Sequence, residues 1–336
     1  MDLIEIKKRA RQRLKGFCRV CPVCNGTVCA GEVPGMGGLG TSSSFTANVE
    51  ALKALRFHMR TLHGVTSPDT SIELFGRSFT TPVQAAPMTG VVYNMGGDMS
   101  EAEFIGHVVA GATKAGSAGW IGDGADPAMF ESGLEAIKAS GGGIAIIKPR
   151  SQDEIKARIA KAEEAGCIAV GVDVDGAGLV TMAKFGQPVS PKTPNEIAEL
   201  VQSTSLPFIL KGIMTKEEGK IAAEAGCAAI VVSNHGGRVL DHTPGAAEVL
   251  PYIAKKVGDK LTILADGGVR TGSDVLKLLA LGAQAVLTGR PLVWGAFGKE
   301  TEGVTTILDT MKAQLIGAML LTGTADVKNV DKHILV

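Results

Sequence analysis

The sequence AIVVSNHGGRVLD, residues 229–241, indicates both the fold and the chemistry of this chain. Its first four residues are apolar and mostly β-branched, as expected for a buried strand. His235, a candidate base, and Arg238, a candidate anion clamp, follow directly, and the two glycines between them let the backbone approach a ligand closely. α/β enzymes hold their catalytic groups just beyond the carboxyl ends of such strands. The alternative interpretation is a polar turn with a surface histidine.

Two further strand candidates run into glycine and arginine. Leu261–Ala265 precedes residues 266–270, DGGVR, and Ala285–Thr288 precedes residues 289–291, GRP. Glycine exposes backbone N–H groups, and arginine adds a forked, permanently charged donor. Because barrel enzymes commonly bind phosphate after strands seven and eight, the two turns together predict one phosphate site.

From about Thr81 onward, short apolar strands alternate with amphipathic helices. The eight strand candidates are Val83–Ala86, Ala118–Ile121, Ile144–Ile147, Ala169–Val174, Phe208–Leu210, Ala229–Val232, Leu261–Ala265 and Ala285–Thr288. The helix candidates between them are Glu101–Ala115, Gln152–Ala165, Asn195–Ser203, Lys216–Ala225, Gly245–Lys256 and Ser273–Leu281. This alternation predicts a parallel sheet, and eight repeats favour a closed TIM (β/α)8 barrel over an open doubly wound sheet. No GxGxxG motif opens the first unit, so the dinucleotide-binding fingerprint is absent.

The sequence before the barrel differs in character from the rest. We predict an N-terminal helical and cysteine-rich extension at residues 1–80, with helices at Ile4–Leu14 and Thr46–Leu62, and a catalytic barrel at residues 81–336.

Charge and hydropathy limit the classes of function. Lysine plus arginine and aspartate plus glutamate both total 34, so the formal net charge is zero. A neutral chain is not a general nucleic-acid or anionic-membrane binder. The charged N-terminus lacks the apolar core of a signal peptide, and no run of about 18 uncharged apolar residues indicates a membrane span. We therefore expect a cytoplasmic protein.

Two more ionisable residues follow strand candidates. Lys211 comes directly after an apolar strand, where a lysine is costly unless it faces an anion, so it is a candidate for a fixed charge beside an electron-accepting ring. A lysine that reaches to the barrel rim is the alternative. Asp175 could orient His235 and stabilise its protonated form. Rim ion pairs could account for Asp175, as for Asp123 and Lys148 at other strand ends.

Four segments together resemble the FMN-dependent α-hydroxy-acid dehydrogenase and oxidase family, which includes glycolate oxidase, lactate oxidase and mandelate dehydrogenase. The segments are Lys211-Gly212, residues 233–241, residues 266–270 and Gly289-Arg290-Pro291, and the likeness runs from about Val49 to the C-terminus. The resemblance implies the same barrel, FMN as cofactor, and oxidation of a small L-2-hydroxy acid, such as lactate or glycolate, to the 2-oxo acid. It also implies a homo-oligomer, a tetramer or octamer.

The resemblance assigns roles to individual residues. His235 would accept the substrate hydroxyl proton, Arg238 would hold the substrate carboxylate, and Asp175 would be the partner of the base. Lys211 would stabilise negative charge on the reduced flavin. The remaining residues implied to contact FMN are Pro87 and Met88 at the flavin edge, Ser233 at the ring, and Asp266, Gly267, Gly268, Arg270, Gly289 and Arg290 along the ribityl chain and phosphate.

The chain departs from this family in the substrate pocket. Ala145 stands where the third strand usually carries a tyrosine, Gly143 where a flavin-binding glutamine is usual, and Thr181 near an expected second carboxylate-binding arginine. Two alternatives therefore remain. One is an FMN enzyme of different chemistry, an isomerase or a reductase, on the same barrel. The other is a flavin-free, phosphate-binding, aldolase-like barrel that uses Lys211 as a Schiff base.

Four of the six cysteines lie within twelve residues. Cys18, Cys21, Cys24 and Cys29 form C-x₂-C-x₂-C-x₄-C, which is close to a ferredoxin-type iron–sulfur pattern. A structural zinc also suits four thiolates, and uncoordinated thiols are the third interpretation. The family that this chain resembles does not usually carry this motif. An iron–sulfur cluster here could pass electrons to a protein partner, which would make the enzyme a dehydrogenase.

Overall fold

The predicted barrel is confirmed by a computed structural model that describes residues 2–336. Eight parallel strands follow one another around the sheet in the order β3-β10-β9-β8-β7-β6-β5-β4. Their bounds are β3 Val83–Ala85, β4 Trp120–Gly122, β5 Ile144–Ile147, β6 Ala169–Asp173, β7 Phe208–Ile213, β8 Ala229–Val232, β9 Thr262–Ala265 and β10 Ala285–Thr288. Ala85 N donates to Ala118 O, 3.3 Å away, across the remaining gap between β3 and β4. The barrel is thus nearly closed.

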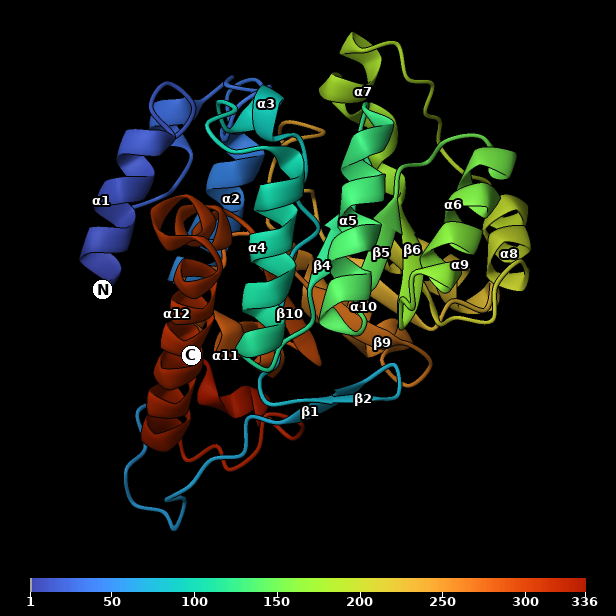
Figure 1. The fold of residues 1–336 in the computed structure, drawn as a ribbon. Coiled ribbons are helices and arrows are strands. Elements are labelled where there is room, and N and C mark those ends of the chain that lie inside the picture. The colour runs from blue at the N-terminus through green and yellow to red at the C-terminus, as the bar shows by residue number, and fades with distance from the viewer. Residues whose placement is uncertain (1) are drawn as a thin grey trace.

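Helices surround the barrel on its outer face (Figure 1). Their bounds are α4 Glu101–Lys114, α5 Pro127–Ser140, α6 Gln152–Glu164, α8 Pro194–Gln202, α9 Lys216–Glu224, α10 Ala246–Val257, α11 Gly272–Ala280 and α12 Arg290–Thr322. Two short helices, α3 Val91–Asn94 and α7 Val180–Lys184, follow β3 and β6. Because α3 and α7 come directly after strands, they lie at the carboxyl-end face of the barrel, where functional loops gather.

Capping residues explain where several helices begin. Ser100, Ser151 and Thr193 each accept a hydrogen bond from the backbone N–H three residues on, and the glutamate at that position bonds back to the cap. Helix α5, which the sequence analysis did not name, begins at the N-cap Asp126 with proline in its first turn and ends at Gly141 in a left-handed conformation. These signals were readable in the sequence.

Helix α12 is long and apolar enough to cross a membrane by length and composition alone. Its backbone leaves helical geometry at Lys299 and Glu300, so it consists of two consecutive helices. Both helices pack with α1, Leu3–Arg13, and α4 around the barrel, and their core residues include Phe297 and Leu308. This packing is that of a core helix.

The N-terminal segment lies against two opposite ends of the barrel (Figure 1). Helices α1 and α2, Ser43–Ala54, and the loop between them lie at the end that carries α3 and α7. A hairpin of β1, Ile72–Leu74, and β2, Arg77–Phe79, crosses the other end. The extension thus contributes to the face where a barrel holds its chemistry.

The predicted helix Thr46–Leu62 is wrong in its second half, since α2 ends at Ala54. Lys277 Nζ donates to Leu52 O, 2.8 Å away, and thereby satisfies a carbonyl at the end of the helix. The chain then becomes extended, and Phe57 forms an antiparallel bridge with Leu335 near the C-terminus. A long-range pairing therefore overrides the local helical pattern.

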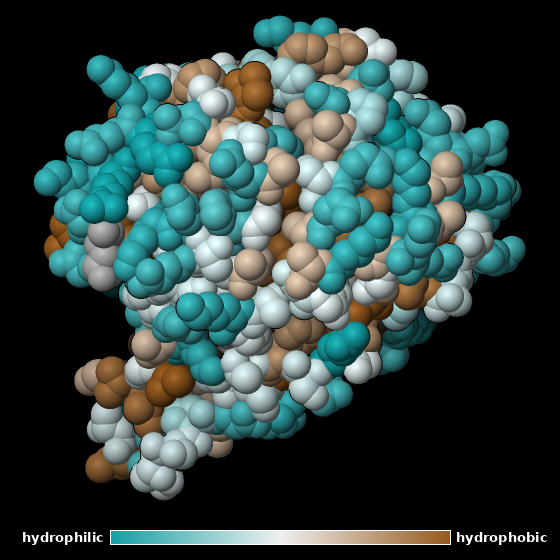
Figure 2. Space-filling view, in the orientation of Figure 1, coloured by the Kyte–Doolittle hydropathy of each residue, from teal (hydrophilic) through white to brown (hydrophobic). Residues whose placement is uncertain are grey.

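Much of the visible surface is hydrophilic, and one of its apolar areas lies at the lower left, where Figure 1 draws the end of α12 (Figure 2). The exposed apolar residues there are Met59, Leu62, Leu321 and Val336. Arg60 N donates to Leu321 O and Val336 N donates to Arg56 O, so these segments are joined. We call these four residues the α12-end patch.

Candidate active site

A large cavity opens at the carboxyl-end face of the barrel. Its empty volume, counted out to the open mouth, is about 1230 Å³, enough for a cofactor and a small substrate. All of the predicted catalytic and FMN-binding residues except Asp175 and Ser233 line it: Pro87, Met88, Lys211, His235, Arg238, Asp266, Gly267, Gly268, Arg270, Gly289 and Arg290. Asp175 and Ser233 lie behind this lining and contact residues in it. The structure therefore brings together residues from five strand ends.

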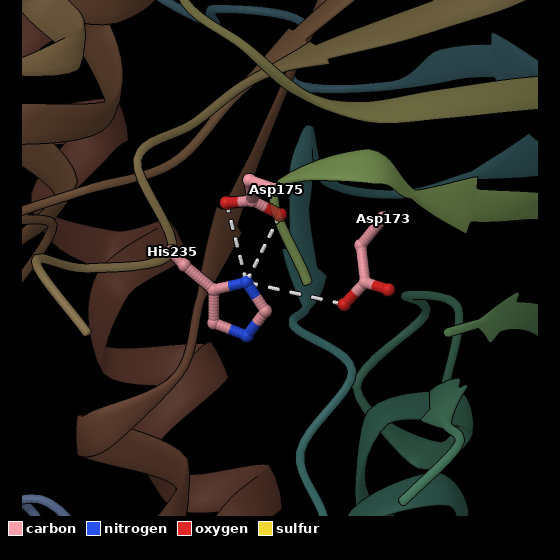
Figure 3. Close-up of side chains that lie close together, drawn as sticks. All are labelled: Asp173, Asp175 and His235. Carbon is pink, nitrogen blue, oxygen red and sulfur yellow. Dashed lines mark hydrogen bonds and ion pairs between the residues drawn. The ribbon is translucent and has the colours of Figure 1, made fainter. Parts of the chain in front are cut away.

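His235 and Asp175 form a base–carboxylate pair (Figure 3). His235 Nδ1 lies 3.2 Å from Asp175 Oδ1 and 3.3 Å from Oδ2, and 3.9 Å from Asp173 Oδ2. The other ring nitrogen, Nε2, points away from both carboxylates. His235 has a φ of 58°, an uncommon conformation for a residue with a side chain and one that clusters at functional sites. The geometry leaves Nε2 available to a ligand in the cavity.

Charge holds Asp175 ionised. Burial alone would raise the pKa of Asp175, but His235 and Lys211 more than offset it and lower that pKa to about 2. Gly212 makes this approach possible, because a Cβ at that position would lie 2.6 Å from the Asp175 carboxylate. An ionised Asp175 orients the ring and favours protonated His235 after proton uptake.

Lys211 lies at the base of the cavity, with its side chain 4% exposed. Its Nζ donates to Ser233 Oγ, 2.9 Å away, and lies 3.5 Å from Asp266 Oδ2. Burial would lower the pKa of Lys211, but Asp266 and Asp175 outweigh it and raise the pKa. The ion pair with Asp266 and the raised pKa favour a positively charged Lys211 over the neutral amine that a Schiff base requires.

Three arginines of the cavity, Arg238, Arg270 and Arg290, form no ion pair with any carboxylate in residues 2–336. Burial lowers the pKa of Arg238 to about 10, and burial with the neighbouring Arg270 lowers that of Arg290 to about 9. Guanidinium groups so close together and without anions are costly unless a ligand supplies the negative charge. The arrangement indicates an anion site.

The N-terminal loop covers part of the cavity mouth. Arg238 Nη1 donates to the carbonyls of Gly35 and Gly37, at 2.6 and 3.0 Å, and its Nη2 donates to Asn94 Oδ1. Arg290 Nε donates to Met36 O at 2.9 Å. A substrate carboxylate must therefore compete with, or join, these carbonyl contacts at Arg238.

The residues fit the FMN that the resemblance implies. Asp266 Oδ1 and Arg270 Nε are buried without a hydrogen-bond partner among the described residues, and both belong to walls of the cavity. A ribityl hydroxyl and a phosphate oxygen are the partners they lack. Gly267 and Gly268, at positive φ, pack against Asn48 so closely that a Cβ would clash, and this keeps the turn bare of side chains.

Two buried ion pairs at strand ends were not predicted as part of the site. Lys148 Nζ lies 2.5 Å from Asp173 Oδ2, and both residues line the cavity. Asp173 Oδ1 has no hydrogen-bond partner among the described residues. Arg150 Nε lies 2.7 Å from Oδ2 of Asp123, and Asp123 also lines the cavity. The strand-end positions were visible in the sequence, but the pairing across neighbouring strands was not.

Asp241, the last residue of the opening motif, anchors the N-terminal segment. Its carboxylate accepts hydrogen bonds from the backbone N–H and hydroxyl groups of both Thr41 and Ser43, at 2.5 to 2.9 Å. Asn48 Nδ2 donates to Asn234 Oδ1 at 2.7 Å. These bonds fix the catalytic loop against the start of α2, a role that sequence reasoning missed.

The four N-terminal cysteines are free and half-buried. Within residues 2–336, the one group of three potential ligand atoms within 4.8 Å of one another belongs to Asp173, Asp175 and His235. No three cysteine sulfurs lie that close. Since Lys148 and Lys211 already neutralise the aspartates, we interpret that group as the surroundings of the base.

Comparison with known proteins gives one family. The family described as FMN-dependent dehydrogenase matches residues 35–184 and 179–336. A 4-hydroxymandelate oxidase of Amycolatopsis orientalis is 32% identical over 330 residues, which cover 87% of this chain and 89% of that protein. The mouse protein 2-hydroxyacid oxidase 2 is 41% identical over 151 residues. That match spans 43% of the mouse protein's length, less than half of it.

Solved structures agree with the fold. A mandelate oxidase with (S)-2-phenylpropionate superposes with a TM-score of 0.80 at 29% identity, over 99% of this chain and 97% of that one. A mandelate oxidase variant with a C4a-OH-FMN adduct superposes with a TM-score of 0.79 at 28% identity, over 98% of both chains. FMN is therefore the cofactor that the family and the cavity both support.

Proposed function

Because this chain belongs to the FMN-dependent dehydrogenase family, we propose that it oxidises a small L-2-hydroxy acid, of the lactate or glycolate type, to the 2-oxo acid. One observation carries the proposal. His235 is held by Asp175 at Nδ1 and turns Nε2 away from that carboxylate, in a cavity that also contains Arg238. A base and a carboxylate-binding cation in one cavity match the two polar groups of a 2-hydroxy acid.

Each residue has a distinct task. The free guanidinium N–H groups of Arg238 bind the substrate carboxylate and orient the hydroxyl toward His235. His235 accepts the hydroxyl proton at Nε2, and Asp175 stabilises the resulting imidazolium. FMN, when bound, supplies the acceptor for the two electrons of the oxidation. Arg270 and Arg290 would hold its phosphate, and Lys211 would place a fixed positive charge near the ring.

Anaerobic mixing of the purified, FMN-loaded protein with L-lactate, glycolate or L-mandelate tests the proposal. We expect one of these acids to bleach the visible flavin absorption and to yield the 2-oxo acid. Bleaching by none of them, in a yellow protein, would favour the isomerase or reductase alternative. A protein that neither binds FMN nor turns yellow would favour the aldolase-like barrel.

The wider organisation is part of the same proposal. We propose a cytoplasmic homo-oligomer, a tetramer or octamer, in which residues 1–80 form an extension to the catalytic barrel at 81–336. The exposed α12-end patch supports self-association, since contiguous apolar surface commonly marks an interface. We also propose that Cys18, Cys21, Cys24 and Cys29 hold a metal, iron–sulfur or zinc, and that a protein accepts the electrons.

A further inference from the structure

The cysteine motif lies before the part of the chain that matches the family model. The family match begins at residue 35, whereas Cys18, Cys21, Cys24 and Cys29 lie between α1 and α2, before that point. The segment nevertheless packs on the cavity, because its neighbours include Arg270 and Arg290. The reaction proposed above gives no role to a cysteine-rich segment at this place.

The distances between the sulfurs distinguish the two alternatives for the motif, a zinc ion and an iron–sulfur cluster. Tetrahedral zinc with Zn–S bonds of about 2.3 Å holds its four sulfurs about 3.8 Å apart. In this structure no three of the four cysteine sulfurs lie within 4.8 Å of one another. Cys18, Cys24 and Cys29 still lie within electrostatic reach of one another, and Arg19 lies within reach of Cys21 and Cys29. A polynuclear cluster, whose irons and sulfides fill the space between thiolates, fits this wider arrangement.

The charges around the motif suit an anion. Arg270 Nη2 lies 3.4 Å from Cys24 Sγ, and Arg290 lies within electrostatic reach of Cys18, Cys24 and Cys29. Four thiolates around an iron–sulfur core leave a net negative charge, which guanidinium groups stabilise. These arginines thus line the cavity that would hold FMN and also lie beside the cysteines.

Two further donors are directed at Cys18. Val20 N lies 3.4 Å from Cys18 Sγ, and Val20 has a φ of 44°, which is rare for a β-branched residue. The Trp294 indole is 4% exposed, and its Nε1 faces Cys18 without a hydrogen-bond partner among the described residues. Donors of this kind hydrogen-bond to ligating sulfurs and tune a cluster's potential. Both N–H groups are thus placed to donate to the sulfur of Cys18.

We propose that Cys18, Cys21, Cys24 and Cys29 together ligate one [4Fe–4S] cluster. Gly26 allows the chain to turn between the third and fourth ligand, since it has a φ of 88° and a Cβ there would lie 2.7 Å from the Phe45 ring. The ligand set needs no residue from elsewhere in the chain.

The task of the cluster rests on the proposed function. Oxidation of a 2-hydroxy acid to the 2-oxo acid releases two electrons and two protons. The cluster accepts one electron at a time, so it is reduced twice per substrate and each time reoxidised by an external one-electron carrier protein. The protons leave to water. The cluster therefore makes the enzyme a dehydrogenase with a protein acceptor.

Metal and sulfide analysis of the anaerobically purified full chain tests the site directly. We expect about four irons and about four acid-labile sulfides per chain. We also expect an electron paramagnetic resonance signal at low temperature that appears only after dithionite reduction. Cys24→Ser should lower the iron content below the wild-type value, because it replaces one of the four thiolate ligands. Cys227→Ser, a buried cysteine in the barrel wall, is the matched control and should keep the wild-type iron content.

Several outcomes would overturn the cluster. These are zinc without iron, or four titratable thiols and no metal after reconstitution with iron and sulfide. Wild-type stoichiometry decides the question even where Cys24→Ser is insoluble. Flavin bleaching by 2-hydroxy acids is measured separately on the same sample. Bleaching without iron refutes the cluster alone, and iron without bleaching refutes the proposed substrate alone.

Discussion

The imidazole of His235 and the carboxylate of Asp175 meet at 3.2 Å, although 60 residues separate them in the chain. One follows β8 and the other follows β6, and the Lys211 strand β7 lies between. The pair therefore exists only because three consecutive strands are in register. It fixes which ring nitrogen of His235 faces the substrate, and it gives the first two predictions.

Replacement of the base should abolish substrate-driven reduction while FMN stays bound. His235→Ala removes the base that we assign to the hydroxyl proton, and a positioned base contributes about 10²- to 10⁴-fold to rate. Stopped-flow bleaching with the best hydroxy acid measures this loss. His333→Ala, an exposed histidine near the C-terminus, should bleach at the wild-type rate. A normal rate in His235→Ala would remove that residue from the mechanism.

Stability should fall in acid as Asp175 takes up a proton. The pKa of Asp175 is lowered from 3.8 to about 2, so its contribution is fully present above pH 3.8 and is lost as pH falls toward 2. That shift corresponds to about 2 kcal/mol. Urea unfolding at pH 5 and pH 3 should therefore show a smaller loss in Asp175→Asn than in wild type. The exposed Asp259→Asn should behave as wild type, and equal acid sensitivity in all three proteins would contradict this linkage.

The sequence predicted most of the barrel, and the candidate catalytic and FMN-binding residues were found together with the strands for one shared reason. The strands are continuous apolar runs, and each of these candidate residues lies at or just after the end of a predicted strand, often beside a glycine. Locating a strand therefore also located the candidate residues at its end. Local helix ends were also readable, as at Ser100 and Ser151.

Contacts between distant segments could not be predicted. Gly35 and Arg238 are 203 residues apart in the sequence, yet the Arg238 guanidinium donates a hydrogen bond to the Gly35 carbonyl. Phe57, which the local pattern places in a helix, instead pairs with Leu335. The Lys148–Asp173 pair needs the register of neighbouring strands, which residue types alone do not give.

Loss of a phosphate-binding arginine should weaken FMN but not riboflavin. Arg290→Ala removes a charged donor, and a hydrogen bond to a charged group contributes about 1.5–3 kcal/mol, or about 10- to 150-fold in Kd. Fluorescence titration of the apoprotein with each flavin measures the difference. Arg77→Ala, on the opposite end of the barrel, is the matched control. Equal weakening toward both flavins would show that Arg290 does not contact the phosphate.

Removal of one partner of the Lys148–Asp173 pair should lower the free energy of unfolding more than replacement of both partners by neutral residues. Both side chains are less than a tenth exposed, and removal of one partner leaves a buried charge, which costs about 3–5 kcal/mol. Lys148→Met alone should therefore destabilise the protein strongly in urea. The double variant Lys148→Met with Asp173→Asn should recover part of that loss, because neither charge remains. Additive losses in the double variant would mean that the two charges do not interact.

Self-association should depend on the α12-end patch. Leu62 is fully exposed at this patch, beside Met59 at 74% exposure, and an apolar side chain held in water favours burial against a second copy. Leu62→Glu places a charge in that contact and should convert the oligomer to smaller species, as measured by light scattering during size-exclusion chromatography. Tyr252→Glu, on an exposed position of α10 away from the patch, should leave the oligomer intact. If Leu62→Glu keeps the wild-type mass, or if the wild-type protein is already a monomer, the patch is not the interface.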